Sequence, residues 1–100
     1  MVIAPRYAKE NAQKALGCIS RGSDAMMRTG KLRANQLSNG QQLGKTSLTK
    51  MSQFKRHQKN AEYSGDICKD RGAVAWLGWG NGYKDGKPVP NASHWAKKQL

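Results

Sequence analysis

Negative charge is what this sequence has least of. Against 18 Lys and Arg residues it has only 6 Asp and Glu residues, so its formal net charge is +12 at pH 7. A balance of this kind predicts an acidic partner, meaning nucleic acid, an anionic membrane or an acidic protein surface. The net charge by itself says nothing about the fold.

Long hydrophobic runs are also missing. The longest apolar stretch, AVAWLGW over residues 73–79, is much shorter than the roughly 20 residues that cross a bilayer. The residues after Met1 turn polar at Pro5 and Arg6, which is not the pattern of a secretory signal. We therefore expect a protein that is not secreted, has no transmembrane segment and has no membrane partner.

Ligands for a metal are few. The chain has two cysteines, Cys18 and Cys68, and two histidines, His57 and His94, and no two of these four form a close pair. Zinc sites take about four such ligands, usually as close pairs. We therefore expect no metal, no cofactor and no small-molecule substrate. We expect the chain to stay in a reducing compartment with both cysteines as buried free thiols, with a disulfide between them as the alternative.

The stretch NGQQLGKTS, residues 39–47, ends like a phosphate-binding loop. That loop requires Gly-x-x-x-x-Gly-Lys-Ser/Thr after a buried strand. Here Asn39 stands where the first glycine belongs, and the preceding residues are polar and basic. We expect no nucleotide site and read the segment as a helix end at Asn39-Gly40 followed by a helix start at Gly44.

Helical periodicity runs through most of the 100 residues, and no stretch alternates like a strand or signals a hairpin. The sequence predicts a single domain over residues 1–100, an all-α compact bundle of four to five short helices with a long C-terminal loop. Asp66 or Ser64 would cap the fourth helix, and Ser93 the last. The expected helices cover residues 6–20, 31–38, 45–60, 67–79 and 94–100, and the loop covers 83–91.

Aromatic residues are scarce, with one Phe and three Trp. A small helical protein needs large side chains in its centre, so we expect these to be core anchors, with base stacking as the alternative. Tyr63 and Tyr83, beside cations in loops, are better stacking candidates. The expected anchors are Phe54, Trp76, Trp79 and Trp95.

The positive residues of the middle third are the strongest functional signal. In α-helical geometry Lys55 and Lys59 share a face, although the set forms no single stripe. Such residues would contact phosphates largely independently of sequence, and no segment resembles a helix-turn-helix. Asp66 and Asp70 lie among cations, as in a solvated ion-pair cluster, so we expect no enzyme. The expected polyanion contacts are Arg28, Lys31, Arg33, Lys45, Lys50, Lys55, Arg56 and Lys59.

Three blocks of the sequence form a recognisable pattern. The first block is Arg33, Ala34, Leu37 and Asn39; the second is Thr46, Phe54, Arg56 and His57; the third is Gly72, Val74, Ala75, Trp76, Trp79 and Gly80, followed by Trp95 and Ala96. In these blocks the chain resembles a small, uncharacterised domain family of tailed bacteriophages, found alone or joined to head-region proteins. Where that family usually has Gly-Gly-Thr ahead of the first block, this chain has Ala25-Met26-Met27.

The resemblance implies phage origin and an accessory role, and it supplies no known activity. Together with the charge, it predicts a non-enzymatic, DNA-binding or polyanion-binding viral protein, located in the virion or the host cytoplasm. One alternative is a minor capsid or cement protein that docks on an acidic capsid lattice. A further alternative is an inhibitor of a host nuclease or defence complex.

Overall fold

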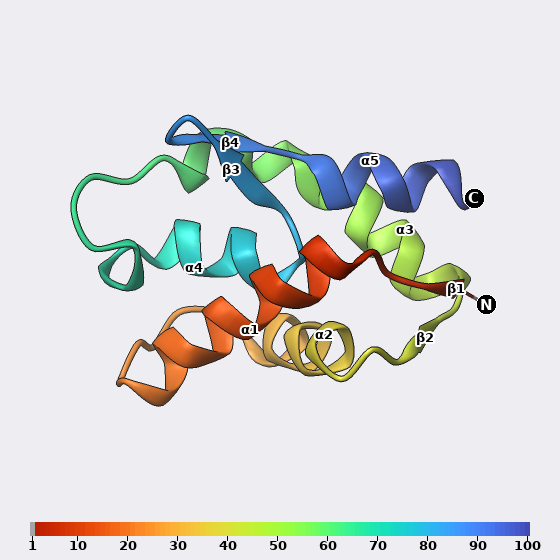
Figure 1. The fold of residues 1–100 in the computed structure, drawn as a ribbon, viewed down its shortest axis with the longest axis horizontal. Helices are drawn as coiled ribbons and strands as arrows, with labels where there is room; N and C mark the ends of the chain where they lie inside the picture. Colours follow the sequence, from red (N-terminus) through yellow and green to blue (C-terminus); the bar gives the residue numbers. More distant parts are fainter. Residues whose placement is uncertain (1) are drawn as a thin grey trace.

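The structure is a computed structural model that describes residues 2–100 (Figure 1). It confirms the predicted all-α class, because helices dominate and the strands form only two short antiparallel pairs. The elements are β1 (Val2–Ile3), α1 (Arg6–Ser20), α2 (Arg28–Ser38), β2 (Gln42–Leu43), α3 (Lys45–Gln53), the 3-10 helices η1 (Phe54–Ala61) and η2 (Ile67–Lys69), α4 (Arg71–Gly78), β3 (Gly82–Lys84), β4 (Lys87–Val89) and α5 (Asn91–Lys98).

Helix α1 packs against both α2 and α4, while α3 packs against α5. Helix η1 continues directly from α3 and packs against α4, so the continuous segment α3–η1 connects the two groups of helices. Both chain termini lie at the same end, beside α3 and α5 (Figure 1). There β1 pairs with β2, with Val2 opposite Leu43.

Small residues let the helices approach closely. Pro5 holds an extended conformation before α1, and the helix then buries Ala8, Ala12 and Ala15 on one face. Alanine in α2 and α5 meets this face or lies near it, and larger side chains fill the spaces that remain. The main core cluster contains Ala8, Ala12, Ala34, Leu37, Leu43, Leu48, Met51, Trp79, Ala92 and Ala96.

The four aromatic side chains expected to anchor the core are buried to different extents. Trp76 is fully buried, and its indole N–H donates to the carbonyl oxygen of Gly82 at 2.9 Å. Trp79 is also buried. Phe54 and Trp95 are half-buried and pack against the main core cluster from its edge.

The prediction of a long C-terminal loop is wrong in the central part of that segment, which forms a hairpin. Strands β3 and β4 pair antiparallel, with Tyr83 opposite Pro88. The two turn residues, Asp85 and Gly86, both have positive φ, at 53° and 78°. This is the requirement of the tight hairpin turn that Asp-Gly favours. The dipeptide was therefore the sequence signal for the hairpin.

The start of α5 also differs from the prediction. The helix begins at Asn91, so Ser93 lies within it and does not cap it. Ser93 is buried and forms two hydrogen bonds with Asn81: its backbone N–H donates to Asn81 Oδ1 at 2.9 Å, and its Oγ accepts from Asn81 Nδ2 at 3.0 Å. These bonds join the end of α4 to α5.

The expectation of free thiols is contradicted, because Cys18 and Cys68 form a disulfide. Cys18 lies at the end of α1, and η2 returns over this end although it is 50 residues away in sequence. The sequence could not show this return, because it depends on how the helices pack. The disulfide therefore removes the basis for expecting a reducing compartment.

Reduction of this disulfide should lower the stability of the fold. A crosslink that spans 50 residues removes chain entropy from the unfolded state, and its loss should cost about 4 kcal/mol. Urea unfolding with and without a thiol reductant measures the difference. The Cys18→Ser/Cys68→Ser double variant is the control and should not respond to reductant. An unchanged midpoint for the wild-type protein would contradict the prediction.

Two glycines should respond in opposite directions to replacement by alanine. A Cβ at Gly72 would lie 2.0 Å from the backbone oxygen of Asn60, so Gly72→Ala forces α4 away from η1 and should cost at least about 2 kcal/mol. A Cβ at Gly17 meets nothing within 4 Å, so Gly17→Ala should stabilise α1 by about 0.5–1 kcal/mol. Urea unfolding of both variants checks the signs; destabilisation of similar size in both would contradict this account of α4 packing.

Candidate functional site

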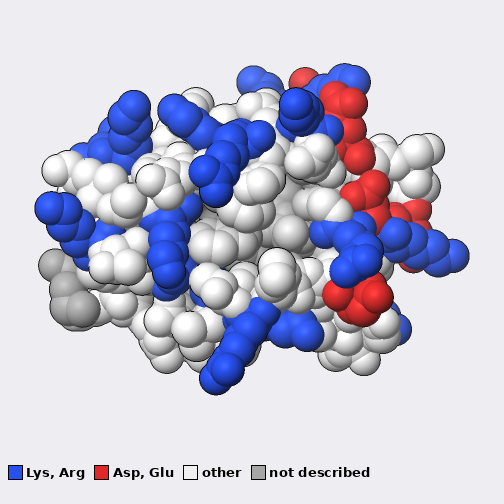
Figure 2. Space-filling view, turned by 180° about the vertical axis from the view of Figure 1, so that it is seen from behind, with Lys and Arg blue, Asp and Glu red and all other residues white. Residues whose placement is uncertain are grey.

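Acidic residues are confined to part of the molecule, whereas basic residues are widespread. Two segments, residues 25–61 and 86–100, contain no Asp or Glu, and they include α2, α3, η1 and α5. Figure 2 shows one face of the molecule, on which the acidic side chains gather toward one end while Lys and Arg are spread over the whole face, that end included. We call the exposed cations of these four helices the basic surface. The acids of the chain are Glu10, Asp24, Glu62, Asp66, Asp70 and Asp85.

Seven of the eight expected polyanion contacts are exposed and belong to the basic surface. The ion pairs among residues 2–100 involve Arg6, Arg71 and Lys87, so these seven cations have no acidic partner within the described structure. They come from α2, α3 and η1. The seven are Arg28, Lys31, Lys45, Lys50, Lys55, Arg56 and Lys59.

The geometry of η1 changes which of these cations align. The predicted continuous α-helix over 45–60 becomes a 3-10 helix at Phe54, which has about three residues per turn. Arg56 and Lys59 are three apart and therefore lie in one row, whereas the expected pairing of Lys55 with Lys59 does not hold.

Two cations of α5 were not among the expected contacts. Lys97 and Lys98 are exposed in its last turn, and α5 packs against α3. Their signal in the sequence was the absence of any acid after residue 85. They extend the basic surface from α3 to the C-terminus.

Arg33, the eighth expected contact, is buried instead, with only 4% of its surface exposed. Its Nη1 donates to Gln36 and, at 2.6 Å, to the hydroxyl of Ser47 in α3. Its guanidinium carbon lies 5.5 Å from the centre of the Trp79 ring. Arg33 therefore joins α2 to α3 and α4, and it cannot serve as a surface phosphate contact.

The charge of Arg33 has no neutralising partner in the structure. Within residues 2–100 no carboxylate pairs with it, and its Nε is buried without a hydrogen-bond partner. Burial lowers the pKa of Arg33 from its ordinary value, because desolvation disfavours the charged form. An arginine stays protonated even so, and the protein carries a buried positive charge beneath the basic surface.

Three aromatic rings lie in a row beside this arginine, and two of them are stacked. Phe54 lies nearly parallel to Trp79, with ring centres 4.8 Å apart and 13° between the planes, and His57 lies 4.7 Å from Phe54. With Lys50 and Arg56 these rings line an open pocket of about 330 Å³, which we call the aromatic pocket. The pocket is lined by Lys50, Gln53, Phe54, Arg56, His57 and Trp79.

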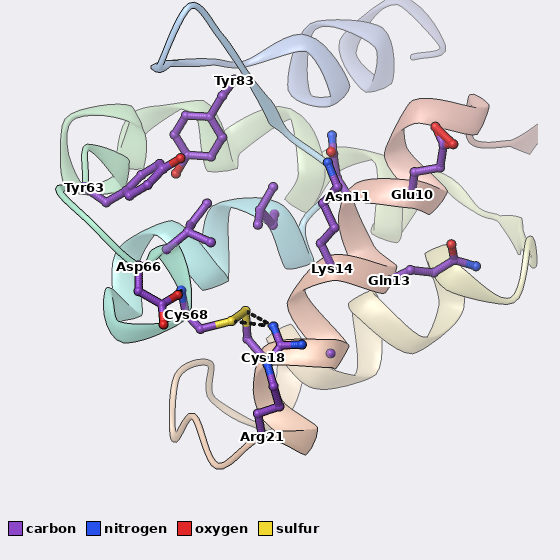
Figure 3. Close-up of a pocket in the computed structure, with 13 residues that line it drawn as sticks. Glu10, Asn11, Gln13, Lys14, Cys18, Arg21, Tyr63, Asp66, Cys68 and Tyr83 are labelled. Carbon is purple, nitrogen blue, oxygen red and sulfur yellow. Dashed lines mark hydrogen bonds between the residues drawn. A yellow bond between two sulfur atoms is a disulfide. The ribbon is translucent and has the colours of Figure 1, made fainter.

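A second and larger hollow lies over the disulfide, between α1 and the segment that contains η2 (Figure 3). Arg21 Nη2 lies 2.9 Å from the sulfur of Cys68 and 3.9 Å from that of Cys18. Glu10 and Asp66 also line this hollow, so both signs of charge meet there. Such a mixed site does not favour a polyanion.

The two tyrosines that were the better candidates for the alternative, base stacking, belong to this second hollow. Tyr63 and Tyr83 pack edge to face, with ring centres 5.2 Å apart. The hydroxyl of Tyr83 donates to the carbonyl oxygen of Ala61 at 2.6 Å. The pair thus lies outside the basic surface, and each ring already has an aromatic neighbour.

Over residues 2–100, no cluster of three or more His, Cys, Asp and Glu residues is arranged to hold a metal ion. Among the same residues, no helix is long and apolar enough to cross a membrane.

No protein family, curated protein or solved structure matches this chain. Its function is therefore inferred from the fold and the charge distribution.

Tyr83 should make the protein sensitive to alkaline pH. Burial, the neighbouring Tyr63 and the Asp70 carboxylate raise the pKa of Tyr83 well above its ordinary value of 10.0. The unfolded chain ionises near that ordinary value while the folded protein keeps the proton, so stability is full below about pH 10 and falls above it.

The variant Tyr83→Phe should lose about 1 kcal/mol at neutral pH, because the hydrogen bond to Ala61 is removed. It should then lose less than the wild-type protein above about pH 10, because the buried phenol is gone. Urea unfolding at neutral and alkaline pH measures both effects. Parallel losses in the two proteins would show that Tyr83 does not carry the alkaline sensitivity.

Proposed function

We propose that this protein binds DNA, or a similar polyanion, through the basic surface and without reading its sequence. The observation that carries the proposal is the seven exposed cations of α2, α3 and η1, which have no acidic partner among residues 2–100 and lie in a segment without acids. Lys97 and Lys98 of α5 extend the same surface. A surface of this kind repels itself unless an anion neutralises it.

The chemistry of the contacts supports binding to phosphates. Lys and Arg on a nucleic-acid surface displace condensed counterions, and this release drives association independently of base sequence. The cations come from several helices, and no single helix presents a row of base-reading side chains. Phosphate contact fixes position on a duplex and carries no sequence information directly.

The resemblance to a phage domain family suggests where this function would be carried out. We propose a non-enzymatic accessory role in a tailed phage, associated with the head or virion, where packaged DNA is the abundant polyanion. Binding would then depend on charge and on the concentrations of protein and DNA, with many copies bound at irregular positions.

A second candidate is docking on an acidic protein lattice, such as a capsid. One observation favours it: Met27 and Leu32 are 85% and 55% exposed beside Arg28 and Lys31 at the start of α2. Exposed apolar side chains next to cations suit a protein partner better than a phosphate backbone. This candidate becomes the better one if DNA does not bind.

The proposal predicts steep salt dependence of binding to a non-specific labelled duplex. Fluorescence anisotropy across a salt series should give a log–log slope of about −4 to −8. Replacing Lys50, Lys55, Arg56 and Lys59 with Gln should make that slope shallower by about 3 to 4, because each lost phosphate contact removes roughly 0.9 from it.

The matched control removes the same charge elsewhere. Replacing Lys9, Lys14, Lys69 and Lys84, which are exposed but lie outside the basic surface, should leave the slope nearly unchanged. Equal losses in both quadruple variants would mean that net charge alone governs binding. No binding by the wild-type protein at low salt would reject the polyanion function.

A further inference from the structure

The aromatic pocket differs from the rest of the basic surface, because it combines cations with partly exposed rings. Lys50 of α3 and Arg56 of η1 line the pocket, and none of the other lining residues is acidic. Its volume of about 330 Å³ lies at the small end of the range of roughly 300–1,000 Å³ for ligand sites. It is thus suited to one small group that carries negative charge.

The rings in the pocket are not equally available. Trp79 is only 8% exposed and is already covered by Phe54 and the Arg33 guanidinium, so it forms the floor. Phe54 and His57 are half-buried, and their planes meet at 42°. A further flat ring can therefore contact the exposed parts of Phe54 and His57.

Arg33 adds charge beneath this floor. It contacts the same indole ring that lines the pocket, is itself nearly inaccessible, and lacks a carboxylate among residues 2–100. A buried charge is screened less than an exposed one, so its field extends into the neighbouring pocket. An anion held by Lys50 and Arg56 would therefore also interact favourably with Arg33.

Phosphate and a flat ring occur together in a nucleotide. In a duplex the flat faces of the bases are covered by their neighbours, whereas an unpaired base exposes a face that can stack on an aromatic side chain. Cationic grooves lined with aromatic rings are typical of single-strand binding.

We propose that the aromatic pocket holds one unpaired nucleotide of a single-stranded nucleic acid, with its phosphate at Lys50 and Arg56 and its base against Phe54 and His57. The proposal rests on the proposed polyanion function and assigns a preference within it. Single strands then bind more tightly than duplexes of equal charge, and the pocket is the place where the two differ.

The test compares three ligands of equal charge: oligothymidine, a single strand of abasic sites of the same length, and a duplex. Anisotropy at one salt concentration should show oligothymidine binding about tenfold more tightly than the abasic strand, since stacking on one ring is worth about that factor. It should also quench Trp fluorescence, because Trp79 lines the pocket.

Variants test whether the difference in affinity between the two strands arises in the aromatic pocket. His57→Ala should remove most of the difference between the two strands and leave abasic binding unchanged. Lys50→Gln/Arg56→Gln should weaken oligothymidine binding more than the charge-matched control Lys45→Gln/Lys59→Gln, whose residues do not line the pocket. Circular dichroism of each variant checks that the helices remain.

The outcomes distinguish failure of the nucleotide pocket from failure of the polyanion function. Equal binding of oligothymidine, abasic strand and duplex by the wild-type protein overturns the nucleotide pocket and leaves the polyanion function standing. Failure of all three to bind at low salt overturns both. A strand preference that His57→Ala leaves intact in a folded protein also overturns the assignment to this pocket.

Discussion

The contacts of Trp79 hold together the elements that carry the basic surface. Its ring lies against Phe54 from η1 and against the guanidinium of Arg33 from α2, at the end of α4. Arg33 in turn reaches Ser47 in α3. Helices α2, η1 and α4 therefore meet at one indole, and α3 is joined to them through Arg33. The positions of the exposed cations relative to one another depend on this junction.

The two ends of the molecule are built by different means. At one end, Cys18 and Cys68 link α1 to η2, near Asp66 and the two packed tyrosines. At the other, α3 and α5 pack through aliphatic and small side chains and carry cations outward. The covalent link secures an end where mixed charges largely balance. The end without acids has no such link, and its surface charge is left for a partner to neutralise.

Local signals in the sequence were sufficient for most helices. Pro5 and the spaced alanines predicted α1, and Asn39-Gly40 predicted the end of α2. Asp85-Gly86 was also a local signal, and it was missed because the flanking residues do not alternate. The change from α to 3-10 geometry at Phe54 has no comparable signal, since it depends on the packing of η1 against α4.

The candidate site was predictable in its composition and not in its arrangement. The seven exposed cations followed from charge alone, because lysine and arginine remain at the surface unless something buries them. Arg33 is the exception, since only the fold brings Ser47 and Trp79 to it. The disulfide and the aromatic pocket likewise join residues that are far apart in sequence. These features require the packed helices, and no spacing of residues indicates them.

The most direct test of the central claim is to map the bound surface by amide NMR. A short DNA duplex is titrated into the protein, and the shifted amide signals are assigned to residues. We predict shifts concentrated in α2, α3, η1 and α5, with the amides around Cys18 and Cys68 unchanged. Shifts centred on the disulfide hollow, or spread evenly over the chain, would contradict the assignment of the basic surface as the polyanion interface.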